Sequence, residues 1–399
     1  MTVETAREAL AGRRVMVTGA AGFIGGRLVE RLRLEIGAEV RVLVRGVASA
    51  SRLARFPVDF VRGDVTDPAA LAAAVRDCDV VFHCAYGTSG SQRHRAWVNR
   101  EGTRRLLEAA ARAKVGRVVH LSTLMVYGKT PDGDLTEEAP RRRFGNAYSD
   151  SKLEAEEIAL ACSRAGRVPV TVLQPTAVHG PWGGVWTETV LRSLRSGRAI
   201  LIENGEGIAN HIYVDDLVTA MLLAAVVEGA VGEAFLASAA EPVTWRQMYG
   251  RFERMLGPPA RTVSLTEAEA RAYWKECQAR RPWLLGELAS LVKKDRAVRD
   301  RLFETRELRA LRELASGVLP EAWQQRIKSR LSSHEVPATS GEGELPVLPL
   351  PPSMINFFRA RTRVRIDKAR RVLGFEPAWD FERSMEITEQ WARWAGFLS

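Results

Sequence analysis

Long hydrophobic runs are missing from this 399-residue chain. No apolar stretch approaches the roughly 20 residues that a transmembrane helix requires, so we expect no stable insertion into a membrane. The first five residues, Met1 to Thr5, are not basic and lead into no apolar segment of the kind found in signal peptides. These absences predict a cytoplasmic protein.

Cysteine and histidine are also scarce, with four and six residues. No two cysteines form a Cys-x-x-Cys pair, which favours reduced, structural thiols over disulfides. The histidines lack the spacing of metal ligands, so we predict no metal site. The cysteines are Cys78, Cys84, Cys162 and Cys277, and the histidines considered as ligands are His83, His94, His120 and His211.

The chain has a formal net charge of +10 but no single basic tract. The excess comes from arginines that are spread over many predicted helices. A nucleic-acid-binding protein usually concentrates such charge on one face or segment. A phosphate-bearing cofactor explains the charge as well, and we expect no nucleic-acid partner.

A glycine-rich turn near the N-terminus organises the rest of the chain. Residues 15–18 are typical of a short strand, and a helical pattern follows with Ile24, Leu28, Leu32 and Ile36 on one face. Between them, Gly19 would turn the chain, Gly22 would admit a pyrophosphate, and Gly25 would let the helix approach the strand. The free N–H groups of the first helical residues, Phe23 and Ile24, would face the phosphates. The arrangement predicts dinucleotide binding.

Five further strands alternate with helical patterns. The strands are expected at residues 40–44, 58–61, 79–85, 118–123 and 170–175. This alternation predicts an α/β protein with a doubly wound parallel sheet, or Rossmann fold, whose ligands lie at the carboxyl ends of the strands. We expect an NAD(P)-binding domain over 1–180, joined by 208–240. A smaller, partly helical substrate domain would span 181–399 and include an insertion at about 261–362.

The second strand ends in a cation where dinucleotide-binding proteins often have an acid. Arg45 stands there and Arg52 follows nearby. A cation suits the 2′-phosphate of NADP, whereas an acidic residue would bind the ribose of NAD. The sequence therefore favours NADP, with NAD as the alternative. Asp64, after the third strand, is a candidate contact for the adenine edge.

A tyrosine and a lysine four residues apart open a predicted helix that runs to about residue 164. This spacing puts Tyr148 and Lys152 on one helix face. We expect the lysine ammonium to lower the pKa of the phenol, which would then exchange a proton with a carbonyl or alcohol. Thr123, at the end of the fifth strand, would hold the same oxygen.

With these motifs in place, the chain resembles the extended short-chain dehydrogenase/reductase family, which includes nucleotide-sugar epimerases and dehydratases. The resemblance runs from Arg13 to about Ala240 and resumes at Val364. The matching segments are 18–25, 63–67, 81–85, 99–103, 122–128, 148–152, 174–180, 213–217 and 366–375.

The resemblance implies the roles of further residues. Tyr148 would be the catalytic acid/base, Lys152 would hold the nicotinamide ribose, and Thr123 would be the catalytic hydroxyl, with Ser122 as the fallback. Relatives usually form dimers through helices equivalent to 98–113 and 148–164, so we expect a homodimer. The remaining implied cofactor-binding residues are Asp64, Val65, Ala85, Asn99, Ser122, Pro175 and Val178.

Two departures from the family pattern bear on the substrate. Dehydratases have Asp-Glu after the catalytic Thr, whereas Leu124 and Met125 stand here, and epimerases usually have an Arg shortly before the position of Tyr213. Both absences favour an oxidoreductase that interconverts a secondary alcohol and a ketone in a small-molecule substrate. The alternatives are a sugar epimerase that retains NAD, and a dinucleotide-sensing scaffold.

The insertion at about 261–362 has no counterpart in the usual family pattern. Residues 265–331 are typical of charged helices with an apolar face, and 336–352 are rich in Pro, Gly and Ser, which suggests a linker or extended strap. The apolar face would contain Trp274, Trp283, Leu284, Leu285, Leu288, Leu291 and Val292. A lid over a lipophilic substrate, a helical elaboration of the substrate domain and a membrane-surface helix remain open.

Overall fold

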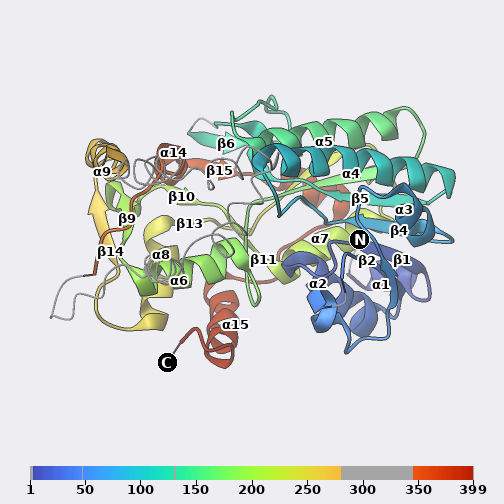
Figure 1. Ribbon diagram of the computed structural model, residues 1–399, viewed down its shortest axis with the longest axis horizontal. Coiled ribbons are helices and arrows are strands. Elements are labelled where there is room, and N and C mark those ends of the chain that lie inside the picture. The colour runs from blue at the N-terminus through green and yellow to red at the C-terminus, as the bar shows by residue number, and fades with distance from the viewer. Residues whose placement is uncertain (1–2, 47, 130–131, 280–344, 399) are drawn as a thin grey trace, which may run out of the picture. The chain divides into compact units, whose positions relative to one another are not determined.

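The computed structural model describes residues 3–46, 48–129, 132–279 and 345–398. The chain divides into two compact units, and each is described by itself (Figure 1). The first comprises Met1–Val190, Gly207–Arg251 and Ala360–Ser399, and the second comprises Leu191–Glu206 and Phe252–Arg359. The domain boundaries expected from the sequence stay a prediction.

The first unit is built on a seven-stranded parallel sheet, which confirms the expected fold class. Its strand order is β12-β7-β5-β4-β1-β2-β3. The order reverses at β1, which pairs with β2 on one side and β4 on the other, so the carboxyl ends of β1 and β4 form the switch point where such sheets bind ligands. The strands are β1 (Arg14–Thr18), β2 (Glu39–Val44), β3 (Asp59–Arg62), β4 (Val80–His83), β5 (Arg117–Leu121), β7 (Val170–Pro175) and β12 (Ala234–Ala237).

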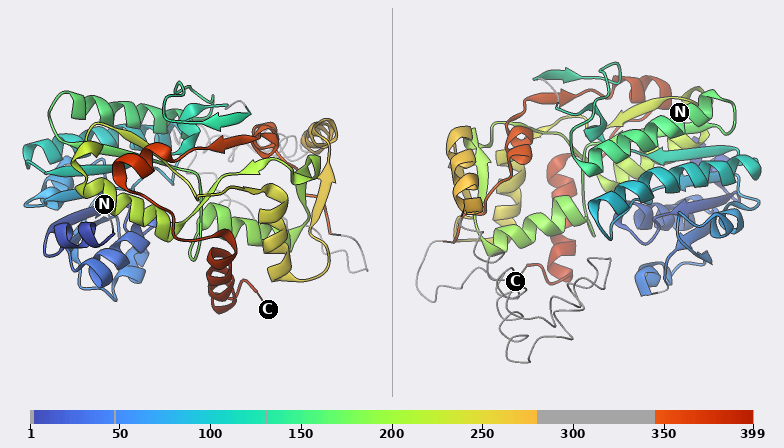
Figure 2. Two further views of the ribbon diagram at one scale, coloured as in Figure 1. Left: turned by 180° about the vertical axis from the view of Figure 1, so that it is seen from behind. Right: turned by 45° about the horizontal axis from the view of Figure 1, so that its top comes forward.

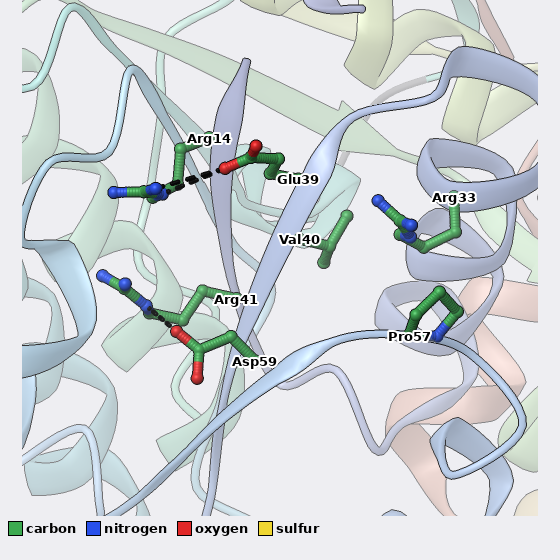
Figure 3. Close-up of a pocket in the computed structure, with 7 residues that line it drawn as sticks. All are labelled: Arg14, Arg33, Glu39, Val40, Arg41, Pro57 and Asp59. Atoms are coloured by element: carbon green, nitrogen blue, oxygen red, sulfur yellow. Dashed lines mark hydrogen bonds and ion pairs between the residues drawn. The ribbon is translucent and has the colours of Figure 1, made fainter. Parts of the chain in front are cut away.

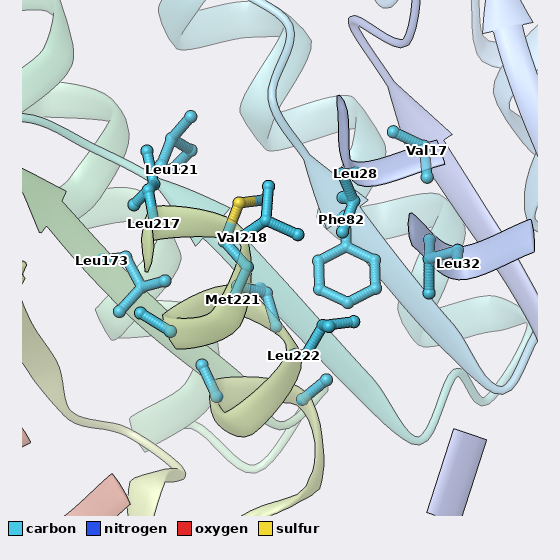
Figure 4. Close-up of a cluster of buried hydrophobic side chains, with 14 of the residues drawn as sticks. Val17, Leu28, Leu32, Phe82, Leu121, Leu173, Leu217, Val218, Met221 and Leu222 are labelled. Carbon is cyan, nitrogen blue, oxygen red and sulfur yellow. The ribbon is translucent and has the colours of Figure 1, made fainter. Parts of the chain in front are cut away.

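Helices cover both faces of this sheet, which explains why its central strands are continuous apolar runs. On one face, Phe82 of β4 packs with Leu28 and Leu32 and with Met221 and Leu222 (Figure 4). On the other face, α4 and α5 run side by side (Figure 2). The first face has α1 (Val3–Leu10), α2 (Phe23–Arg31) and α7 (Val214–Val226), and the second has α3 (Pro68–Val75), α4 (Gln92–Arg112) and α5 (Ala147–Arg164).

Short strand pairs complete the first unit. The tail returns to it through buried Asn210, whose Nδ2 donates to Thr362 O at 2.8 Å and whose Oδ1 accepts from Val364 N at 2.8 Å. The pairs are β6 (Gly133–Leu135) with β15 (Thr362–Val364), β8 (Ala177–His179) with β11 (His211–Tyr213), and β10 (Ile208–Ala209) with β13 (Val243–Thr244), and the last helix is α15 (Phe381–Trp394). Two helices, α6 (Thr189–Ser196) and α8 (Trp245–Leu256), run through the positions where the units divide.

The second unit contains the described part of the insertion. Its parallel pair is β9 (Ala199–Ile202) with β14 (Thr262–Leu265), and its helices include α9 (Glu267–Ala279) and α14 (Pro352–Arg359). Residues 346–348 lie beside Arg198, which directly precedes β9, because Arg198 N donates to Pro346 O at 2.7 Å and Leu348 N donates to Arg198 O at 2.9 Å. The rest of the expected apolar face, from Trp283 to Val292, and most of the expected strap lie outside the described residues. The three alternatives for the insertion stay predictions.

Within the described ranges, no helix is both long enough and apolar enough to cross a bilayer.

Candidate active site

The glycine turn after β1 can exist only without side chains at two positions. Gly19 has a φ of +68°, and a Cβ there would lie 2.7 Å from Ala85 N. A Cβ on Gly25 would overlap the carbonyl group of Gly19, whose carbon would lie only 2.8 Å away. The turn therefore packs directly against the end of β4 and the start of α2, as a close approach to pyrophosphate requires.

The N-terminus of α2 carries no side-chain cap. Gly22 occupies its N-cap position, and no side-chain hydrogen bond satisfies the first turn. By contrast, Asp67, Ser91 and Asn146 cap α3, α4 and α5 with side-chain oxygens. Uncapped N–H groups at the positive end of the helix dipole form a site for an anion. The residues present thus fit a dinucleotide pyrophosphate.

A buried hydrogen-bond chain fixes the end of β4 beside this turn. Ala85 N donates to Thr18 Oγ1 at 3.2 Å, Thr18 Oγ1 contacts His83 Nδ1 at 2.8 Å, and His83 Nε2 contacts Thr103 Oγ1 at 3.0 Å. Because Thr103 donates to Asn99 O at 2.8 Å, it accepts from His83, which places the imidazole proton on Nε2. Burial lowers the pKa of His83 to about 3, so the ring is neutral. Through Thr18, the His83 ring holds Ala85 at the switch point.

The two expected cations differ in their contacts. The Arg45 guanidinium lies 3.4 Å from Ser89 Oγ and 3.5 Å from Thr88 Oγ1, both from the segment that follows β4. Arg52 lies 4.9 Å over the ring of Trp182 and pairs with Glu30 at 3.8 Å. Arg45 therefore contacts only neutral hydroxyls in these interactions, whereas Arg52 is partly neutralised.

Other expected cofactor contacts have structural partners of their own. Asp64 Oδ1 accepts from Thr66 N at 2.9 Å and Thr66 Oγ1 at 2.7 Å. Asn99 Oδ1 accepts from Gly87 N at 2.7 Å, and its Nδ2 donates to Ser151 Oγ at 2.9 Å. These bonds hold the loops after β3 and β4 in place. Of the remaining three, Val65 packs against the core under α3 and α4, Pro175 ends β7, and Val178 lies in β8.

The structure brings the side chains of Tyr148 and Thr123 together. Tyr148 exposes 47% of its surface from the first turn of α5. Burial raises the pKa of Tyr148 above the usual value for tyrosine, and the neighbouring Thr123 side chain opposes that rise. The expected lowering by Lys152 is wrong for this arrangement, because the lysine ammonium donates to the carbonyl of Leu121. The phenol therefore stays protonated at neutral pH.

Lys152 is buried on α5, one helical turn after Tyr148. Burial lowers its pKa to about 8, against the opposing effects of Glu156 and Cys84. The group is thus protonated below about pH 8 and neutral above it.

Ser122 and Thr123 face different partners. Ser122 Oγ donates to Glu156 Oε2 at 2.5 Å inside the protein, whereas the Thr123 side chain reaches Tyr148. The fallback hydroxyl is therefore committed to a buried carboxylate, and only Thr123 has the geometry of the expected catalytic hydroxyl.

Sequence reasoning missed two features of this site. The ring of Tyr86 lies edge-on to Tyr148, with centroids 6.2 Å apart, and exposes 49% of its surface. Glu156 lies behind the site with no exposed surface. The spacing of Tyr148, Lys152 and Glu156, four residues apart on one helix, was a signal that could have identified the carboxylate.

The histidine that precedes Gly180 has a structural role. His179 is a core residue, with 1% of its surface exposed and Nε2 2.9 Å from Ser384 Oγ. Among the residues that the structure describes, no group of three or more His, Cys, Asp or Glu side chains is placed to hold a metal ion.

A hollow of about 300 Å³ lies at the opposite edge of the sheet, at the amino ends of β1 to β3 (Figure 3). Two arginines in its wall pair with carboxylates, Arg14 with Glu39 at 3.2 Å and Arg41 with Asp59 at 2.6 Å. Because these charges neutralise each other away from the switch point, we assign no ligand to this hollow.

Comparison with known proteins identifies the family. The model described as the NAD dependent epimerase/dehydratase family matches residues 15–237. The chain belongs to this family. The resemblance to extended short-chain dehydrogenases/reductases is thus confirmed, and with it an enzyme family that uses NAD(P).

The names of relatives in this family indicate different reactions. The chain is 30% identical to the 2-alkyl-3-oxoalkanoate reductase of Shewanella oneidensis over 61% of its own length and 67% of that protein. It is 29% identical to the 4-hydroxy-2-methyl-3-oxo-4-farnesyl-3,4-dihydroquinoline-1-oxide ketoreductase of Stigmatella aurantiaca, over 65% of its own length and 78% of that protein. For some curated relatives, the match spans only 55% or 62% of their length.

The fold agrees with a solved structure. The dTDP-glucose 4,6-dehydratase DesIV of Streptomyces venezuelae, crystallised with NAD and TYD, superposes with a TM-score of 0.65 at 21% identity. The match covers 97% of this chain and 99% of DesIV. At this identity, the likeness shows the fold alone.

Proposed function

We propose that the protein is an NAD(P)-dependent oxidoreductase that interconverts a secondary alcohol and a ketone. The observation that supports this most is the contact between the side chains of Tyr148 and Thr123, with Lys152 one turn further along α5. When bound, the nicotinamide ring supplies or accepts the hydride. The protein's part is to hold the carbonyl and to move a proton.

Each of the three side chains has a separate task. Thr123 orients the carbonyl oxygen by a hydrogen bond. Tyr148 donates its proton to that oxygen during reduction, and its raised pKa keeps the proton available at neutral pH. Lys152, cationic below about pH 8, would hold the nicotinamide ribose through its ammonium.

The proposed cofactor contacts follow the strand ends. The pyrophosphate would lie at Gly19, Gly22 and Gly25 and at the N–H groups of Phe23 and Ile24. Asp64 and Val65 would contact the adenine. The nicotinamide half would lie by Ala85, Asn99, Ser122, Lys152, Pro175 and Val178.

A ketone is a better candidate than a sugar that undergoes dehydration. Leu124 and Met125, half-buried after Thr123, offer no acid or base for elimination. The reductases from Shewanella and Stigmatella are named for oxo compounds with alkyl or farnesyl groups. We therefore propose a small lipophilic ketone as the substrate class.

Stoichiometry distinguishes this reaction from epimerisation, the second candidate, which the family match supports. Wild-type protein incubated with NADPH and a panel of ketones is expected to consume one NADPH per ketone reduced, measured by absorbance and product analysis. An epimerase would instead interconvert sugars without net consumption of added cofactor. Interconversion of nucleotide sugars without NADPH loss, together with no ketone reduction, would reject the proposal.

We also propose a homodimer formed through α4 and α5. A largely apolar hollow of about 250 Å³ lies between these helices. It is lined by Leu107, Ala111, Ile158 and Cys162 together with polar residues at its rim. Ala111 and Ile158 are partly exposed there, and apolar surface of this kind suits a second copy of the chain.

The preference for NADP is proposed on Arg45. Arg45→Asp is expected to weaken NADPH binding about tenfold or more, because it puts an anion beside the 2′-phosphate, while NADH binding changes little. Titration of both cofactors by fluorescence measures the ratio of their Kd values. Arg7→Asp, a substitution with the same change of net charge at an exposed residue of α1, is the control. An unchanged ratio in Arg45→Asp would remove Arg45 from the site.

A further inference from the structure

A buried carboxylate lies behind the three candidate catalytic side chains. Glu156 Oε2 accepts from Ser122 Oγ at 2.5 Å, and Oε1 accepts from Gln174 Nε2 at 2.8 Å. The same Oε1 pairs with Arg141 Nε at 2.6 Å. A fully buried carboxylate is costly unless it is paired and hydrogen-bonded, and these three donors occupy both of its oxygens.

The three donors come from three segments that carry the site. Ser122 directly precedes Thr123 after β5, and Gln174 directly precedes Pro175 in β7. Arg141 lies in the segment that leads to Tyr148 at the start of α5. One carboxylate therefore ties together the backbone segments that place the hydroxyl, the phenol and the expected nicotinamide contact.

Glu156 also acts on the ammonium of Lys152, one helical turn away. Its charge raises the pKa of Lys152, against burial, which lowers it. The other titratable groups that interact with Lys152 are Cys84 and His83 from β4 and its end, and His120 from β5. Burial raises the pKa of Cys84 to about 12 and lowers those of both histidines, so these three are uncharged at neutral pH. Within the described chain, Glu156 is the anion among these neighbours of Lys152.

We propose that Glu156 is a positioning residue that keeps Lys152 cationic and holds Thr123 against Tyr148, with Arg141 as its counter-ion. The proposal rests on the reaction proposed above for its catalytic meaning. Its electrostatic part, the effect of Glu156 on the charge of Lys152, does not depend on that reaction.

We expect substitutions of the two partners of the ion pair to shift the pKa of Lys152 in opposite directions. Glu156→Gln removes an anion near Lys152 and lowers the lysine pKa, by about one unit for an opposite charge at short range. Arg141→Gln removes the counter-ion of Glu156, so the carboxylate acts on Lys152 unopposed and we expect the lysine pKa to rise. A role in folding alone predicts no such reversal of sign.

The test is an NMR titration of the full-length protein with lysine labelled with ¹³C at Cε. The Lys152 signal is assigned from its loss in Lys152→Arg. We expect a midpoint near 8 in the wild type, a lower one in Glu156→Gln, a higher one in Arg141→Gln, and partial recovery in Glu156→Asp. Glu157→Gln, the same change at the exposed neighbouring residue, should leave the midpoint unchanged.

Kinetics add the catalytic readout. If Lys152 must be protonated, the rate falls as pH rises through its pKa, and the alkaline limb of kcat should move with the NMR midpoint. A one-unit decrease from a midpoint near 8 lowers kcat of Glu156→Gln about fivefold at pH 8.

An unchanged Lys152 midpoint in Glu156→Gln, or an equal shift in Glu157→Gln, overturns the proposal. Should Glu156→Gln fail to fold, Arg141→Gln decides, because 32% of the Arg141 side chain is exposed and the residue lies outside α5. A midpoint that does not rise in Arg141→Gln overturns the proposal. If the midpoints move as expected but no carbonyl compound is reduced, the positioning effect stands and the proposed function fails.

Discussion

Tyr148→Phe is expected to lower kcat about 10³-fold while changing the Kd of NADPH by less than about twofold. Loss of a positioned general acid typically costs two to four orders of magnitude. Cofactor affinity should survive, because the phenylalanine ring keeps the edge-on contact with Tyr86 and because the pyrophosphate contacts lie at α2. Stopped-flow or steady-state NADPH absorbance gives kcat, and fluorescence titration gives Kd.

Tyr86→Phe is the matched control for this variant. It removes a phenol whose ring lies 6.2 Å from that of Tyr148 but which has no contact with Thr123 in the described structure. We expect kcat to change by less than about fivefold, with any larger change in KM for the ketone. Equal turnover by Tyr148→Phe and wild type, or a greater loss in Tyr86→Phe, would transfer the role of proton donor away from Tyr148.

The main sheet was predictable because burial on both faces leaves a plain signal. Residues 40–44 and 170–175 consist mostly of β-branched and apolar residues, and they form β2 and β7 with ends that differ by at most one residue. The short pairs were not predicted. β6 has three residues, and its partner β15 lies more than 200 positions further along the chain, so neither strand has a local pattern that announces the other.

The site was predictable where it depends on the spacing of residues along the chain. It was not predictable where it depends on which way a side chain turns in the fold. Glycine spacing and the Tyr148–Lys152 interval follow from the local geometry of a turn and a helix. The direction of the Tyr148 pKa shift does not follow from spacing, because it depends on the Lys152 ammonium turning to the carbonyl of Leu121. Likewise, α5 has three acidic residues close together, and only the fold shows that Glu156 is buried and Glu157 is exposed.

The glycine turn allows the second large prediction. Gly25→Ala is expected to abolish measurable NADPH binding and to destabilise the fold by about 1–3 kcal/mol or more, since a Cβ there meets the backbone carbonyl of Gly19 and not a movable side chain. Relief of that contact requires the first turn of α2 to move away from β1, and the uncapped N–H groups move with it. Thermal unfolding with and without NADPH measures both effects, because a ligand that binds the native state raises Tm.

Gly250→Ala is the control for the loss of a glycine. Gly250 lies in α8, where an added Cβ has nothing within 4 Å, so alanine should stabilise the helix by up to about 1 kcal/mol and leave NADPH binding unchanged. The two variants make the same chemical change in helices of the same chain, but only in Gly25→Ala does the added Cβ meet backbone atoms. A Gly25→Ala protein that folds and shows the wild-type rise of Tm with NADPH would place the pyrophosphate away from α2, and the assignment of every other cofactor contact would fail with it.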